Sequence, residues 1–184
     1  MNETTTWVGL LRGINVGGHR RLPMADLRAL VADLGHQRVR THKQSGNLVF
    51  ESENAGPAAE QRTRLEAHIE RTFGFGVTVI VHRADHFRTI AATNPYPGPQ
   101  ADPATVGTVF LAERPDRSAV AGFVPPVSGD EQCHLDDDAV HLWCPAGFGR
   151  TKLTNSYVEK HLGVSATTRN WATILSVIEL TEPD

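Results

Sequence analysis

The first half of the chain alternates between extended and helical spacing of its apolar residues. An apolar run at 7–11, interrupted only by Gly9, predicts a buried strand. A helix follows it, because apolar residues then recur at i, i+3, i+4 and i+7, at Leu27, Leu30, Val31 and Leu34. Gly35 is placed to end that helix. The opening of the chain is therefore a strand, a glycine-rich loop and a helix.

Two short strands and a second helix come next. Strands at 39–43 and 47–51 are joined by a tight turn in which Gly46 supplies backbone freedom. A helical pattern covers 57–73, and a β-branched run at 77–81 predicts another strand. This order, β-α-β-β-α-β, is that of a ferredoxin-like unit. With a connecting helix at 85–92, we assign residues 1–93 to a ferredoxin-like α+β subdomain.

A proline-rich stretch at 94–105 is the predicted linker, and a second, smaller α+β subdomain covers 106–184. It opens with a strand at 106–111 and a short helix at 118–123. Two helices close the chain, at 152–162 and from about 169 to 180, the last with Thr168 as N-cap. The second half is thus predicted as β-α-β-β-α-α, an imperfect echo of the first.

The hairpin between the short helix at 118–123 and the helix at 152–162 has a register that the sequence itself favours. If 137–138 form a two-residue turn, Cys133 lies opposite Leu142, and His134 lies opposite His141. One face is then wholly apolar and includes Cys133 and Cys144, which we expect to act as small hydrophobes. The other face holds polar groups including His134, Asp136 and His141. We interpret it as a solvated face rather than a metal site.

Composition excludes several classes of protein. The 184 residues are 40% hydrophobic and 21% charged, which is ordinary for a globular protein. The formal net charge of −3 gives the whole molecule no attraction to nucleic acid or anionic membrane. No apolar run is long enough to span a bilayer, the N-terminal segment lacks the features of a signal peptide, and two cysteines are too few for a disulfide scaffold. We expect a cytoplasmic protein.

Glycine or threonine stands beside cations in four polar segments, which suggests a site for phosphate or carboxylate. In three of them the sequence then enters a predicted helix, whose N-terminus attracts anions. Ordinary turns, solvated arginines and helix caps explain the same residues equally simply. The candidate ligand-binding residues are Arg12, Asn15, Gly17, Gly18 and His19; Lys43, Gln44, Ser45 and Asn47; Arg150 and Lys152; and Arg169 and Asn170.

Other chemistries have little support. The first loop lacks the Gly-Lys-Ser/Thr ending of a P-loop, and no G-x-S-x-G elbow is present. We therefore expect no metal and no cofactor. RNA-recognition sheets stack bases on central aromatics, and here only Trp7 and Phe50 are available. Nucleic-acid binding is open but unsupported by any motif.

The same segments resemble a bacterial family of domains of unknown function, number 1697. The resemblance covers nearly the whole chain and is carried by LLRGINVGG at 10–18, PMADL at 23–27, QSGN at 44–47, GRTKLTN at 149–155 and LGVSATTRNW at 162–171. It implies two α+β subdomains of ferredoxin-like character. It implies no activity, because the family has no established reaction, substrate or cofactor.

Three functional hypotheses stay open. The first is a binding module for a phosphate-bearing or carboxylate ligand, such as a nucleotide, held between the two subdomains. The second is a structural or protein-interaction module, in which glycines serve turns and arginines serve an interface. The third is an enzyme acting on a phosphorylated small molecule, with His19 or Lys152 as proton carrier and Ser45 as hydroxyl.

Overall fold

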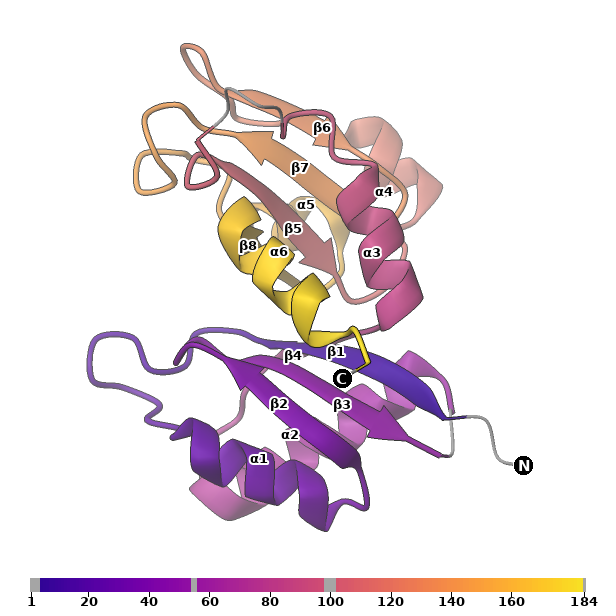
Figure 1. Cartoon of the computed structure of the whole chain (residues 1–184). Coiled ribbons are helices and arrows are strands. Elements are labelled where there is room, and N and C mark those ends of the chain that lie inside the picture. Colours follow the sequence, from indigo (N-terminus) through magenta and orange to yellow (C-terminus); the bar gives the residue numbers. More distant parts are fainter. Residues whose placement is uncertain (1–3, 54–55, 98–101, 184) are drawn as a thin grey trace. The chain divides into compact units, whose positions relative to one another are not determined.

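The computed structural model describes residues 4–53, 56–97 and 102–183. The chain divides into two compact units (Figure 1). Unit 1 comprises residues 1–87 and 176–184, and unit 2 comprises residues 88–175. The predicted boundaries at 93 and 106 stay a prediction, and part of the predicted linker, 98–101, lies outside the described residues. Each unit is described by itself below.

Unit 1 is a ferredoxin-like fold, as predicted. Its antiparallel sheet has the order β2-β3-β1-β4. Helices α1 and α2 cover one face of this sheet (Figure 1). The elements are β1 Thr5–Leu11, α1 Met24–Asp33, β2 Gln37–His42, β3 Asn47–Ser52, α2 Ala58–Phe73 and β4 Val79–Arg83. Helix α3, Ala84–Ala92, begins in unit 1 and ends in unit 2.

The core of unit 1 lies between the sheet and its two helices. Trp7 of β1 and Phe50 of β3 are cross-strand partners and both are fully buried. The apolar stripe predicted for α1 supplies Leu27, Leu30 and Val31 to the same core. Burial of large side chains of this kind stabilises each by roughly 1.5–3 kcal/mol, so the core fixes the register of β1 and β3.

Unit 2 repeats the same topology. Its antiparallel sheet has the order β6-β7-β5-β8, which corresponds strand for strand to the sheet of unit 1. None of the helices in the described part of the chain is long and apolar enough to cross a membrane. The elements are β5 Val106–Leu111, α4 Arg117–Gly122, β6 Gln132–Leu135, β7 Ala139–Trp143, α5 Asn155–Leu162 and β8 Ala166–Asn170. Helix α6, Trp171–Leu180, begins in unit 2 and ends in unit 1.

Strand β8 corrects the predicted end of the chain. The sequence predicted a helix from about residue 169 with Thr168 as its N-cap, but Ala166–Asn170 pairs with β5 along the sheet edge. The cap of α6 is Asn170, whose Oδ1 accepts a hydrogen bond from the N–H of Thr173 at 2.9 Å. The strand was missed because Ala-Thr-Thr-Arg-Asn has no apolar alternation, and threonine is common both at caps and in strands.

The register of the β6–β7 hairpin is confirmed residue for residue, with Cys133 opposite Leu142 and His134 opposite His141. The expectation of a solvated polar face is wrong at His141, which is fully buried. Its ring contacts Thr93, a residue of unit 2 that follows α3, and Thr108, which the neighbouring Asn94 contacts in turn. Pattern alone placed His141 on the correct face but could not show that another segment contacts that face.

A chain of hydrogen bonds satisfies the buried ring. Thr93 donates its hydroxyl to the Ile90 carbonyl, so its oxygen is free to accept from Nε2 of His141 at 3.3 Å. Nδ1 then accepts from the hydroxyl of Thr108 at 3.0 Å, and that oxygen accepts from Nδ2 of Asn94 at 3.2 Å. This assignment of donors and acceptors is that of the neutral imidazole with its proton on Nε2. Burial lowers the pKa of His141 to about 4.

We predict that His141 makes unit 2 sensitive to mild acid. Its pKa is about 4 in the folded chain and 6.5 in the unfolded chain, so only the unfolded chain takes up the proton between these values. Stability should fall by roughly 3 kcal/mol as pH drops from 6.5 to 4, and this contribution should then level off. Urea unfolding across this pH range measures the loss.

The matched comparison uses two variants, His141→Gln and His134→Gln, because His134 is the exposed partner of His141 on β6. The His141 variant should lose this part of the pH dependence, whereas the His134 variant should keep it. Equal pH profiles for wild type and His141→Gln would contradict the prediction.

Candidate functional site

The glycine-rich loop after β1 forms a small hairpin, which we call the finger (residues 13–21). The N–H of Asn15 donates to the Arg20 carbonyl, and the N–H of His19 donates to the Val16 carbonyl, both at 3.2 Å. Gly17 and Gly18 form the tip with φ of 60° and 79°, the left-handed values of a two-residue hairpin turn. The finger extends from the end of β1 (Figure 1). Its backbone is used for this turn rather than for an anion nest at the start of α1.

Asn15 fastens the finger to the rest of unit 1. Its Oδ1 accepts from the N–H of Leu22 at 2.8 Å, and its Nδ2 donates to the Leu22 carbonyl at 2.9 Å. The same Nδ2 donates to the carbonyl of Gln44 at 2.7 Å, in the turn between β2 and β3. The side chain of Asn15, predicted to bind a ligand, is therefore committed to three internal bonds.

The turn between β2 and β3 is packed tightly against β1 and the finger. Gly46 has φ of 71°, and a Cβ placed there would approach the Cβ of Leu11 to 2.6 Å and Cδ1 of Ile14 to 2.8 Å. Asn47 is fully buried and donates from Nδ2 to the His42 carbonyl and to Oγ of Ser45. The QSGN segment thus serves the turn, and its contacts explain why it accompanies the LLRGIN segment.

Five basic residues belong to the finger, its base and the turn beside it. His19, Arg20 and Arg21 of the finger are exposed, and so is Lys43 in the adjoining turn. Arg12, at the base of the finger, is half-buried, and its N–H donates to the Thr78 carbonyl at 2.9 Å. We call these five residues the cationic end of unit 1. Nine of the thirteen predicted site residues belong to the finger, to its base or to the 43–47 segment beside it, namely Arg12, Asn15, Gly17, Gly18, His19, Lys43, Gln44, Ser45 and Asn47.

The four other predicted residues lie in unit 2. Arg150 and Lys152 are exposed in the segment before α5, whose N-cap is Thr154. Nη1 of Arg169 donates to Oγ1 of Thr167 at 3.0 Å and to the Thr168 carbonyl at 2.8 Å. Burial lowers the pKa of the Arg169 guanidinium to about 10. Asn170 caps α6, as described above, so its side-chain oxygen has a structural partner.

The two thiols lie as the hairpin register predicted. Cys133 is half-buried and Cys144 is buried, both on the helix-covered face of the unit 2 sheet. Burial raises the pKa of Cys133 to about 12, and it also raises that of Cys144. Thiols held in the neutral form are poor nucleophiles, so these cysteines fit a packing role.

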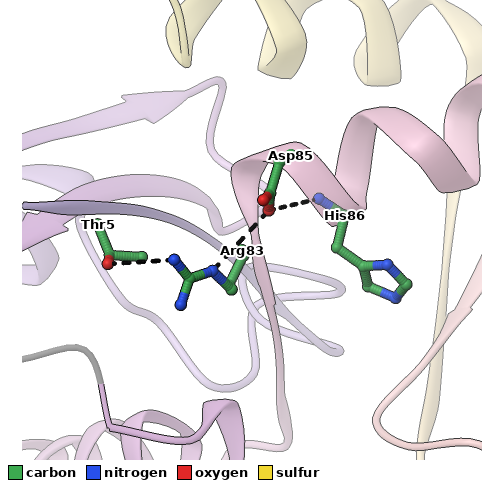
Figure 2. A network of polar contacts seen from close by, with 4 residues as sticks. All are labelled: Thr5, Arg83, Asp85 and His86. Atoms are coloured by element: carbon green, nitrogen blue, oxygen red, sulfur yellow. Dashed lines mark hydrogen bonds and ion pairs between the residues drawn. The ribbon is translucent and has the colours of Figure 1, made fainter.

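A further polar network joins β1, β4 and α3 within unit 1 (Figure 2). Arg83 donates from Nη2 to Oγ1 of Thr5 at 3.5 Å, and its Nε lies 3.9 Å from Oδ1 of Asp85. The same Oδ1 accepts from the N–H of His86 at 2.7 Å, in the first turn of α3. Arg83 also lies over the ring of Trp7. These contacts fix the junction of β4 and α3, which the sequence did not single out.

Comparison with known proteins identifies the family. The model of a family described as "Protein of unknown function (DUF1697)" matches residues 4–141, which confirms the expected family. The predicted blocks at 149–155 and 162–171 lie beyond the matched residues. The structure of the conserved bacterial protein SP0830 from Streptococcus pneumoniae superposes with a TM-score of 0.74 at 22% sequence identity. That similarity covers 98% of this chain and 100% of the other, and it shows the fold alone. No curated protein matches the chain.

We predict that Gly46→Ala destabilises unit 1 by roughly 2–4 kcal/mol, because the added Cβ clashes with Leu11 and Ile14 and the backbone is left-handed. Gly74→Ala is the matched control. Gly74 has φ of 74° but an open surrounding, so only backbone strain of about 1–2 kcal/mol applies. Chemical denaturation of both variants measures the difference. Equal losses would show that the close approach at Gly46 is unimportant.

Proposed function

The chain belongs to the DUF1697 family of proteins of unknown function, and we propose that it binds a phosphate-bearing or carboxylate ligand through the cationic end of unit 1. The chain as a whole has a formal net charge of −3, so a group of five basic side chains is a local exception. Four of the five are exposed and can meet a ligand without first being dehydrated. Arginine also matches phosphate and carboxylate with paired N–H donors.

The observation that carries the proposal is the backbone conformation of two of these cations. Arg20 and Lys43 have φ of 49° and 55°, in the left-handed region that favours glycine. Such a conformation costs a long side chain roughly 1 kcal/mol or more. Asn15 shares this conformation, but its three hydrogen bonds account for it. Arginine and lysine at such positions support a role for their side chains.

The proposal narrows the ligand-binding set that the sequence suggested. Asn15, Asn47 and Asn170 are committed to internal hydrogen bonds, so we assign them to positioning rather than to ligand contact. Arg150 and Lys152 remain candidates for the same chemistry in unit 2. The contacts of Ser45 do not support the enzyme hypothesis, because its hydroxyl accepts a hydrogen bond from Asn47 and so serves the turn.

A structural or protein-interaction role is the second candidate. It is favoured by one observation: the contacts of Asn15 with Gln44, and of Gly46 with Leu11, explain the most distinctive segments of the sequence without any ligand. This role leaves the left-handed Arg20 and Lys43 without a reason.

We predict that Arg20→Gly and Lys43→Gly abolish ligand-dependent stabilisation while stability without ligand stays equal or rises by up to about 1 kcal/mol. Glycine relieves the left-handed strain but also adds freedom to the unfolded chain, which limits the gain. Thermal unfolding of the full chain with inorganic phosphate, nucleotides, sugar phosphates and dicarboxylates, at low and high salt, measures both effects.

The control is Arg38→Gly. Arg38 is a left-handed residue of β2, and it is paired with Glu51 and lies outside the cationic end. Its replacement should change stability but leave the ligand-dependent shift intact. The proposal fails if no anion stabilises the wild type, or if the shift survives in both glycine variants of the cationic end.

A further inference from the structure

A hollow in unit 1 lies between the finger, α2 and the segment that leads into β4. Its volume is about 430 Å³, within the range of roughly 300–1,000 Å³ in which small-molecule sites fall. The hollow combines three structural parts that are distant in sequence, and all three belong to unit 1. Its lining includes Arg20, Thr63, Glu66, Glu70, Val77 and Thr78.

Fixed contacts hold the walls in place. On α2, Thr63, Glu66 and Glu70 share one face because they follow at i, i+3 and i+7. Oε1 of Glu66 accepts from the N–H of Val79 at 2.8 Å, which ties the helix to the start of β4. The Thr78 carbonyl accepts from the N–H of Arg12 at 2.9 Å, which ties the floor to the base of the finger.

The charges that line the hollow are of both signs. Arg20 stands on the finger side, where its Nη1 would lie 3.8 Å from a Cβ at Gly13, so it folds back over the base of the finger. Glu66 and Glu70 stand on the helix side. Within the described ranges, no ion pair joins Arg20 to either carboxylate. A ligand that carries both a negative and a positive group could therefore bind Arg20 with the first and the glutamates with the second.

We propose that this hollow binds a small dipolar molecule, with a phosphate or carboxylate on Arg20 and an ammonium group on Glu70 and the second oxygen of Glu66. The inference rests on the proposed function in that Arg20 is the anion-binding group of both. It adds the chemical class of the ligand. A simple anion satisfies Arg20 but shares the hollow with the carboxylates of Glu66 and Glu70, so the dipolar molecule binds more tightly.

The probes are phosphoethanolamine, inorganic phosphate and ethanolamine, each titrated into the full chain and followed by isothermal calorimetry and by amide NMR shifts. Phosphoethanolamine should bind about tenfold more tightly than inorganic phosphate, as expected for one added ion contact. Amide shifts should concentrate at residues 76–79 and along the Thr63–Glu70 face of α2. Ethanolamine alone should bind most weakly, because it lacks the group that Arg20 holds.

Three variants separate the contributions. Glu70→Gln should remove the tenfold preference and leave phosphate binding equal or tighter. Arg20→Gly should weaken both ligands. Glu60→Gln, an exposed change in the first turn of the same helix and outside the hollow, should alter neither.

The outcomes distinguish this inference from the proposed function. Phosphate binding that depends on Lys43, with no preference for phosphoethanolamine and no effect of Glu70→Gln, would overturn the inference and leave the proposed function standing. Phosphoethanolamine binding that depends on Arg20 and Glu70 but not on Lys43 would support the hollow as the binding site. It would overturn the proposal that the whole cationic end binds the ligand. Absence of binding by any probe, with the chain folded, would overturn the inference, and the wider ligand panel would then decide the proposed function.

Discussion

The candidate site depends on one close approach, between the turn that joins β2 to β3 and the end of β1. Gly46 lies so near to Leu11 and Ile14 that no side chain fits between them. The N–H of Leu11 donates to the Gly46 carbonyl, and Asn15 reaches the Gln44 carbonyl from the finger. These contacts join two segments some thirty residues apart. They convert a glycine-rich loop, which would otherwise be mobile, into a finger with a defined position.

Glycine and asparagine meet the main structural demands of this junction. The basic residues Arg12, His19, Arg20, Arg21 and Lys43 belong to the same two segments, the finger with its base and the turn beside it. The left-handed φ of Arg20 and Lys43 is a local conformational strain, which lowers the free energy of unfolding. Arg20 also lines the hollow against α2, so the finger connects the basic end of unit 1 with two carboxylates of the helix.

Much of the fold was predictable because hydrophobic spacing carries it. The strand and helix order of unit 1, and the register of the β6–β7 hairpin, follow from which residues can share an apolar face. Prediction failed at β8, whose short polar edge strand has no apolar alternation, and at His141. His141, on the polar face of that hairpin, contacts Thr93, which lies 48 residues before it in the sequence. Local pattern does not include such distant partners.

The sequence by itself determined the ferredoxin-like first half, the family, and the segments in which polar groups deserve attention. Glycines, cations and asparagines at strand and helix ends are local features that can be read without coordinates. Only the tertiary structure decided which of them are structural. The side chains of Asn15, Asn47 and Asn170 form hydrogen bonds with backbone groups. Arg20 lines a hollow together with Glu66 and Glu70, and no sequence motif connects these three residues. The reason is physical: a hydrogen bond or a cavity depends on distance in space, which packing sets and sequence spacing does not.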